Sequence, residues 1–162
     1  MSNADKILSK NDAAVLVEKW KQAGDEVVFT NGCFDILHLG HVDYLEKAKQ
    51  LGSRLVVGLN ADASVKRLKG ADRPLNNEYA RARMLSALSC TDAVILFDEP
   101  TPLELITDIK PDVLVKGSDY TIDTIIGADI VIEHGGSVKT IDLVNGYSTT
   151  GIIDKIKSQL NK

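Results

Sequence analysis

The chain has 162 residues, of which 44% are apolar, and it carries a formal net charge of −4. That size suits one domain with a single core, and the negative charge argues against binding to nucleic acid or to a membrane surface, since both need a basic face. No apolar run approaches the roughly 20 residues of a membrane span. The two cysteines, Cys33 and Cys90, have neither disulfide nor metal spacing, and no signal-peptide pattern opens the chain, so we expect a cytoplasmic protein.

Hydrophobic runs alternate with amphipathic segments along most of the chain. We expect residues 1–10 to be an N-terminal tail and residues 11–162 to form one domain. Five strands are expected, at about residues 26–30, 54–59, 92–97, 112–116 and 137–141. Helices are expected at about residues 12–23, 41–50, 62–68, 76–88, 102–109, 124–134 and 148–160, with Asn11 or Asp12 capping the first of them and Ser148 the last.

This alternation predicts an α/β fold: a single doubly wound, five-stranded parallel sheet of the Rossmann-like type. The continuous apolar run in residues 54–59 is typical of a strand that is buried on both faces. In such sheets ligands bind beyond the carboxyl ends of the strands. Three polar stretches fall there, at residues 30–41, 116–120 and 147–150, and we expect them to build the functional site.

The most informative stretch runs from Thr30 through a glycine-containing turn to His38 and His41. A strand that leads through a turn into a helix N-terminus is an anion-binding arrangement, because free N–H groups and the helix dipole point at the turn. The two histidines are three residues apart and share one side of the helix entry, so both could donate to phosphate oxygens. Two other interpretations stay open: a metal pair, for which the sequence offers no third ligand, and a polar turn with incidental histidines.

The turn between the strand and the histidines offers further groups. Backbone N–H groups near Cys33 and Phe34 could cradle a phosphate or a base, as a nest does. Phe34 is favoured as a core anchor beneath the turn, and Cys33 as a small buried hydrophobic residue. Asp35 is expected to hold the loop through backbone hydrogen bonds, with a catalytic base as the less favoured role. Gly40 would let a nucleotide approach the backbone closely.

Two later stretches could complete a phosphate site. Ser148 and the two threonines after it open the last helix, where hydroxyls and free N–H groups could meet the β- and γ-phosphates. Lys116 ends a buried strand, and a charge in that position is well explained by a bound phosphate. Asp119 and Tyr120 follow it and could read the substrate or the base, or simply form a turn.

The pattern T-x-G-x-F-D-x-x-H-x-G-H over residues 30–41 resembles the signature of the cytidylyltransferase-like nucleotidyltransferases. The resemblance implies catalytic roles for His38, His41 and Lys116. It implies nucleotide contacts from Thr30, Asn31, Gly32, Cys33, Phe34, Gly40, Asp119, Ser148, Thr149 and Thr150, and substrate contacts from Asn60, Lys66, Lys69, Arg73 and Arg83. The alternative for the basic residues among these substrate contacts is a solvated surface charge without a role in binding. The basic residue that follows the Ser/Thr turn in many members is missing here, since Gly151 stands next.

Residues 68–74, 111–120 and 146–153 narrow this resemblance to the adenylyltransferase domains of ADP-heptose synthases. That likeness implies ATP with Mg²⁺ as donor and D-glycero-β-D-manno-heptose 1-phosphate as acceptor, giving ADP-heptose and pyrophosphate; no dedicated metal site is predicted. Many such domains are fused to a sugar kinase, so we expect a separate heptose kinase to supply the substrate, and we expect a homodimer. The alternatives are a glycerol-3-phosphate cytidylyltransferase that uses CTP, and a nucleotide-binding regulatory module without turnover.

Overall fold

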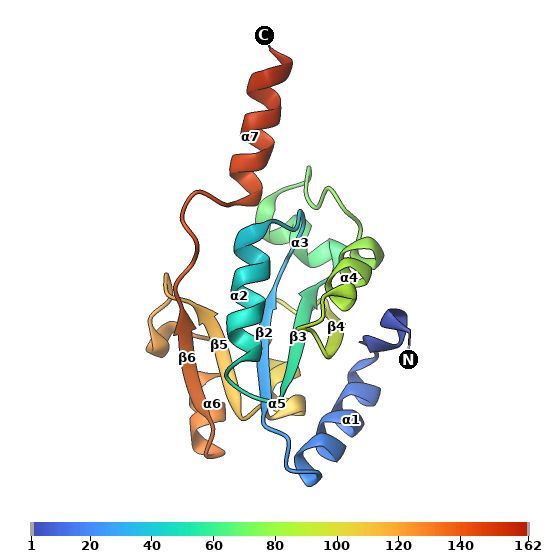
Figure 1. The fold of residues 1–162 in the computed structure, drawn as a ribbon, viewed down its shortest axis with the longest axis vertical. Coiled ribbons are helices and arrows are strands. Elements are labelled where there is room, and N and C mark those ends of the chain that lie inside the picture. Colours follow the sequence, from blue (N-terminus) through green and yellow to red (C-terminus); the bar gives the residue numbers. More distant parts are fainter. Residues whose placement is uncertain (1, 162) are drawn as a thin grey trace.

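The computed structural model describes residues 2–161 and contains one sheet of six parallel strands (Figure 1). The strands are β1 (Ile7–Leu8), β2 (Val27–Gly32), β3 (Arg54–Asn60), β4 (Ala93–Phe97), β5 (Val113–Gly117) and β6 (Ser137–Ile141). Their order across the sheet is β1-β4-β3-β2-β5-β6, and every neighbouring pair is parallel. The doubly wound α/β fold predicted from the sequence is therefore confirmed.

Helices cover both faces of this sheet and bury two separate cores. They are η1 (Asn3–Lys6), α1 (Lys10–Gln22), α2 (Leu39–Lys49), α3 (Asp62–Lys69), α4 (Glu78–Ala87), α5 (Leu103–Ile109), η2 (Ile122–Thr124), α6 (Ala128–Glu133) and α7 (Thr149–Leu160). Successive strand side chains point to opposite faces. Val27 and Phe29 accordingly pack with α1, α5 and α6, whereas Val28 packs with α2 and α4.

The prediction of five strands is wrong, because β1 adds a sixth at the edge of the sheet. Ile7 pairs with Val94 and Leu8 with Ile95, and Lys6 Nζ donates to the carbonyl of Thr91 at 2.9 Å. Residues 3–8, which lie within the segment expected to be a tail, thus form η1 and β1. A strand of two residues is too short to give the alternating pattern by which strands are read from sequence.

Two helix predictions also need correction. Ser9, rather than Asn11 or Asp12, caps α1, since its hydroxyl accepts a hydrogen bond from the N–H of Asp12. The helix expected at residues 124–134 is divided into η2 and α6. Gly127 lies between them with φ +84°, which lets the chain turn before α6 starts.

The order of the strands places the switch point of the fold between β2 and β5. β2 pairs with β3 along its whole length, from Val27↔Arg54 to Gly32↔Leu59. Its pairing with β5 consists of Val28↔Val113 and Phe29↔Leu114 and lies near the amino end of β2. Beyond these pairs the carboxyl ends of β2 and β5 are free to hold a ligand between them.

The last helix has an unusual position. Figure 1 shows α7 projecting from the body, so that only its beginning lies near the sheet. None of its residues is buried, although Ile156 and Leu160 are apolar. Across residues 2–161, no helix combines the length and apolarity that crossing a membrane requires.

Candidate functional site

A cavity of about 690 Å³ opens at the carboxyl ends of β2 and β5. The segments that line it include the turn between β2 and α2, the loop after α3, the end of β5 with its following loop, and the start of α7. The predicted site residues that line the cavity are Asn31, Gly32, Cys33, Phe34, His38, Gly40, His41, Asn60, Lys69, Arg73, Lys116, Asp119, Ser148, Thr149 and Thr150. Stretches that lie more than 100 residues apart in the sequence therefore share one site.

Three predicted site residues, Thr30, Lys66 and Arg83, do not line the cavity. Thr30 is fully buried beneath it, where its hydroxyl donates to the carbonyl of Val115 at 3.0 Å and lies 2.7 Å from the hydroxyl of Tyr44. Lys66 is exposed on α3. Arg83 is exposed on α4, where it donates to the hydroxyl of Tyr79 at 2.9 Å. None of the three side chains is placed to touch a ligand in the cavity.

The two histidines form a stacked pair at the start of α2. Their ring centroids are 3.8 Å apart with an interplanar angle of 20°. Burial lowers the pKa of His38, and burial together with repulsion from His38 lowers the pKa of His41 to about 4. Both rings are therefore neutral at pH 7, which permits the stacking and leaves each ring one N–H to donate. In both rings Nδ1 is buried without a partner among residues 2–161.

Gly40 has a packing role at this point. A Cβ there would lie 3.0 Å from His38 ring atoms and 3.3 Å from Tyr147 Cβ. The hydroxyl of Thr149 also donates to the carbonyl of Ile36 at 3.4 Å. The segment leading into α7 therefore packs directly against the histidine turn, so the two phosphate-binding stretches predicted from the sequence face each other.

Lys116 offers a cation with few competing partners. Its Nζ lies 3.4 Å from the carbonyl of Asn31 and 5.5 Å from the centroid of the Tyr120 ring. No carboxylate forms an ion pair with it in the described part of the chain. Burial lowers the pKa of Lys116 to about 8, against the opposing influence of Cys33 and Asp119. A half-buried cation of this kind would gain from an anionic ligand.

The start of α7 supplies a second set of donors. Ser148 caps the helix as predicted, since its hydroxyl accepts a hydrogen bond from the N–H of Gly151 at 2.9 Å. The first amides of a helix have no acceptor within the helix itself. Thr149 and Thr150, the first two residues of α7, both line the cavity, so their amides could meet an anion there. Burial raises the pKa of the Cys33 thiol, but the residue is only partly buried, whereas a buried one was predicted.

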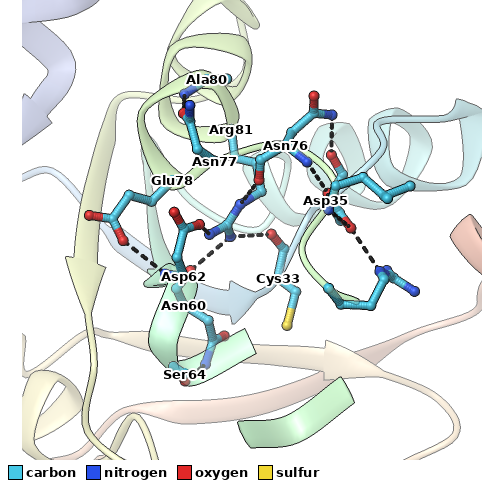
Figure 2. Close-up of polar contacts among 12 residues, drawn as sticks. Cys33, Asp35, Asn60, Asp62, Ser64, Asn76, Asn77, Glu78, Ala80 and Arg81 are labelled. Atoms are coloured by element: carbon cyan, nitrogen blue, oxygen red, sulfur yellow. Dashed lines mark hydrogen bonds and ion pairs between the residues drawn. The ribbon is translucent and has the colours of Figure 1, made fainter. Parts of the chain in front are cut away.

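Asp35 is a buried anchor for the loop between α3 and α4 (Figure 2). Its carboxylate, 2% exposed, accepts hydrogen bonds from the N–H groups of Leu75 and Asn76 and from Arg73 Nε. Burial raises the pKa of Asp35, but the two backbone N–H groups and Arg73 outweigh it, so the pKa is lowered. The carboxylate holds the loop, as predicted from the sequence, and is not free to act as a base.

Sequence reasoning missed Arg81, which is fully buried on α4 (Figure 2). Its guanidinium joins three segments around the cavity, as described below. Arg81 lies four residues before Leu85, so the two share one face of α4, and that face is buried. This spacing could have indicated that the arginine is buried. Tyr44 was missed in the same way: it lies three residues after His41 on α2 and lines the cavity.

A parallel, doubly wound sheet with imidazoles and helix N-termini around a cavity at its switch point defines a nucleotide-binding α/β domain. The chain belongs to the cytidylyltransferase-like family, whose model matches residues 29–155. The resemblance predicted from residues 30–41 is therefore confirmed.

Individual relatives agree with this assignment. The chain is 56% identical to the bifunctional protein HldE of Syntrophotalea carbinolica over 93% of its own length and 31% of that protein. It is 55% identical to the HldE of Mesorhizobium japonicum over 97% of its length and 32% of that protein. It thus spans about a third of the length of the curated relatives it matches. A solved structure, the lipopolysaccharide core biosynthesis protein from Thermoplasma volcanium GSS1, shares 33% identity at a TM-score of 0.60, covering 77% of this chain and 100% of that one.

Proposed function

We propose that the chain is a nucleotidyltransferase that transfers AMP from ATP to D-glycero-β-D-manno-heptose 1-phosphate, giving ADP-heptose and pyrophosphate. The observation that carries this proposal is the shared cavity of His38, His41 and the start of α7. Donors from two sides of one cavity suit a polyphosphate that must be held while one of its bonds is broken. The likeness to the bifunctional HldE proteins and to the lipopolysaccharide core biosynthesis protein supports the choice of sugar phosphate.

The reaction asks for positioned charge rather than for a strong base. A phosphate monoester has its second pKa near about 6, so the acceptor phosphate is already mostly dianionic at neutral pH. One of its oxygens attacks the α-phosphorus of ATP in line, the bond from that phosphorus to the bridging oxygen breaks, and pyrophosphate leaves with the electron pair. Catalysis then consists of alignment and of donors aimed at the transferring and departing phosphates.

Several groups around the cavity supply those donors. His38 and His41 each offer a ring N–H, Lys116 offers an ammonium group, and the first amides of α7 offer N–H groups along the helix dipole. Mg²⁺ would enter as part of the MgATP substrate. Within residues 2–161, no three His, Cys, Asp or Glu side chains are grouped so that they could hold a resident ion.

The acceptor would bind on the side of the loop after α3. Lys69 and Arg73 line the cavity there, and Asp35 engages only Nε of Arg73, which leaves the outer nitrogens of that guanidinium for a phosphate. Asn60, at the end of β3, lines the same cavity. The homodimer, the separate heptose kinase upstream and the cytoplasmic location belong to the same proposal and are supported by the family resemblance alone.

A pyrophosphate-release screen tests the proposal, with ATP and CTP each crossed with both anomers of the heptose 1-phosphate and with glycerol 3-phosphate. ATP with the β-anomer should give the fastest release. Release with CTP and glycerol phosphate would instead identify the cytidylyltransferase, and no release with any pair would favour a regulatory module.

Histidine variants test the catalytic assignment in the same assay. His38→Ala and His41→Ala should each lower turnover by at least about 100-fold, the scale found for single charge-stabilising donors. His134→Ala is the matched control, because His134 is exposed at the end of α6 and does not line the cavity. Near-normal turnover in the first two variants would contradict the assignment.

A further inference from the structure

The turn after β2 has a backbone conformation that its central residue disfavours. Phe34 has φ +45°, in the left-handed region that a bulky side chain rarely adopts. Such a conformation persists only where the surroundings determine it, and it is concentrated at functional sites. The residues on either side of Phe34 are both held from other elements: Cys33 through its carbonyl and Asp35 through its carboxylate.

Arg81 holds the first of these neighbours. Its guanidinium makes four hydrogen bonds: Nη1 to the carbonyls of Cys33 (2.8 Å) and Asn60 (2.7 Å), Nε to the carbonyl of Asn76 (3.0 Å), and Nη2 to Oδ1 of Asp62 (2.8 Å). Figure 2 shows these acceptors converging on one side chain. A buried charge is costly unless it is paired and fully hydrogen-bonded, and the planar guanidinium fixes the direction of each bond. Arg81 therefore determines where the Cys33 carbonyl points.

The direction of that carbonyl also sets the direction of the next N–H group. The peptide bond between Cys33 and Phe34 is trans, so its C=O and N–H point to opposite sides. The Phe34 N–H thus points away from the guanidinium. Arg81 does not line the cavity, whereas Cys33 and Phe34 do. In residues 2–161 no acceptor is found for this N–H, which leaves it free to meet a ligand.

The same network fixes the acceptor side of the cavity. The carbonyl of Asn76 accepts from Arg81, while the N–H of Asn76 donates to Asp35. Arg73, which lines the cavity, is held by the same carboxylate. One cluster, made of the buried Arg81 and Asp35 and the half-buried Asp62, therefore connects the histidine turn to the loop before α4.

We propose that Arg81 is a positioning residue that holds the Cys33 carbonyl so that the Phe34 N–H is aimed at a phosphate of the bound nucleotide. The inference rests on the proposed function only in taking a nucleoside triphosphate as the ligand. Arg81 itself does not touch the ligand. It acts through a single peptide group, and the bound phosphate completes the hydrogen bonding of the turn.

The test is an NMR titration of the ¹⁵N-labelled full chain with MgATP and no acceptor. In the wild type, the Phe34 amide should shift together with the Thr149 and Thr150 amides. In Arg81→Lys, which keeps the charge but lacks the planar fork, the Phe34 shift should be lost while the threonine amides still respond. The Kd for MgATP should rise by about 10- to 100-fold, as for one lost hydrogen bond to a charged group.

Two further variants make the result decisive. Arg83→Lys is the matched control, because Arg83 lies on the same helix and reaches only Tyr79; it should bind as the wild type does. Asp62→Asn keeps the guanidinium but removes its carboxylate partner at the more exposed end of the cluster, and should weaken binding in the same direction, by about threefold to tenfold. Asp62→Asn still tests the inference if Arg81→Lys does not fold.

The outcomes separate this inference from the proposed function. A wild-type Phe34 response that both Arg81→Lys and Asp62→Asn leave intact would overturn the inference and leave the function standing. If the wild type showed no response to MgATP at any residue of the cavity, the proposed function would fail and the inference with it. Loss of the Phe34 response alone, with the response of the α7 amides preserved, would support both.

Discussion

At the scale of single residues, the site is built from groups whose proton affinity has been lowered. His38, His41 and Lys116 all have a depressed pKa, in each case mainly because burial disfavours the charged form. A polyphosphate would reverse that effect, since an anion within a few ångströms favours the charged form of each group. Binding should therefore be linked to proton uptake. In the unliganded protein, the same lowered pKa values should reduce the free energy of unfolding at acid pH.

The acid-side stability should depend on His41. The pKa of His41 is about 4 in the folded protein and about 6.5 in an unfolded chain. Well above pH 6.5 the imidazole is neutral in both states, so it does not change the free energy of unfolding there. Between pH 6.5 and 4 the unfolded chain binds more protons, so the free energy of unfolding falls as the pH falls. His41→Asn should flatten that fall. Urea denaturation at several pH values measures it, with His134→Asn as control; an unchanged slope in His41→Asn would contradict the burial argument.

Lys116 should set the alkaline limit of nucleotide binding. With its pKa at about 8 in the free protein, it loses its charge as the pH rises through that value, so the affinity for MgATP should fall above about pH 8. Calorimetry in buffers of different ionisation enthalpy should show proton uptake in this range. Lys116→Met should bind about 10- to 100-fold more weakly at pH 7 and without the alkaline fall. Lys66→Met, outside the cavity on exposed α3, should match the wild type; equal behaviour of the two variants would contradict the assignment.

At the scale of elements, two helix caps should behave differently although their chemistry is the same. Ser148 accepts from Gly151 N–H at the start of α7, and Asn77 accepts from Ala80 N–H at the start of α4. Loss of a cap costs about 1 kcal/mol of helix stability. α4 buries part of its surface, so Asn77→Ala should lower the melting temperature of the whole domain, whereas α7 buries no residue, so Ser148→Ala should loosen that helix alone.

Hydrogen exchange and thermal melting, measured on both cap variants, separate these effects. Ser148→Ala should speed exchange within residues 149–160, leave the melting temperature unchanged and weaken MgATP binding. An equal loss of melting temperature in both variants would mean that α7 packs against another surface in solution, as a homodimer would provide.

Most elements could be predicted because their signals are local. The buried run of β3, the Ser148 cap and the glycine-containing turn before the histidines each follow from a few neighbouring residues. β1 could not be predicted, since two residues carry no periodicity and its stability comes from pairing with β4, far along the chain. The division between η2 and α6 depends on Gly127 lying against Ile106, which is also a tertiary contact.

The same distinction applies to the site. The histidine pair and the start of α7 could be predicted from residue type and position. In the structure both line one cavity. Thr30 shows the limit: it belongs to the motif, yet its side chain lies on the buried face of β2, against Tyr44. The network around Arg81 joins backbone carbonyls from separate segments, and no pattern of side chains in a sequence marks the direction of a carbonyl.

At the scale of the whole molecule, the N-terminal segment should matter for stability and not for chemistry. Lys6 Nζ donates to the carbonyl of Thr91, and β1 covers the edge of β4. Residues 2–8 do not line the cavity. Deleting them should lower the melting temperature and promote aggregation through the open edge, while pyrophosphate release at low temperature persists. Lys6→Met should show a milder loss of about 1 kcal/mol, with Lys19→Met on α1 as control; lost turnover in a still-folded deletion would contradict this separation.

The short pairing between β2 and β5 has a consequence for how the domain responds to its ligand. The sheet is joined there by Val28↔Val113 and Phe29↔Leu114, and the cavity lies directly beyond that junction. A molecule held by the histidine turn on one side and by Lys116 on the other would connect β2 and β5 beyond this short pairing. Occupancy should therefore slow amide exchange in β3 and in β6 alike, although neither strand lies at that junction.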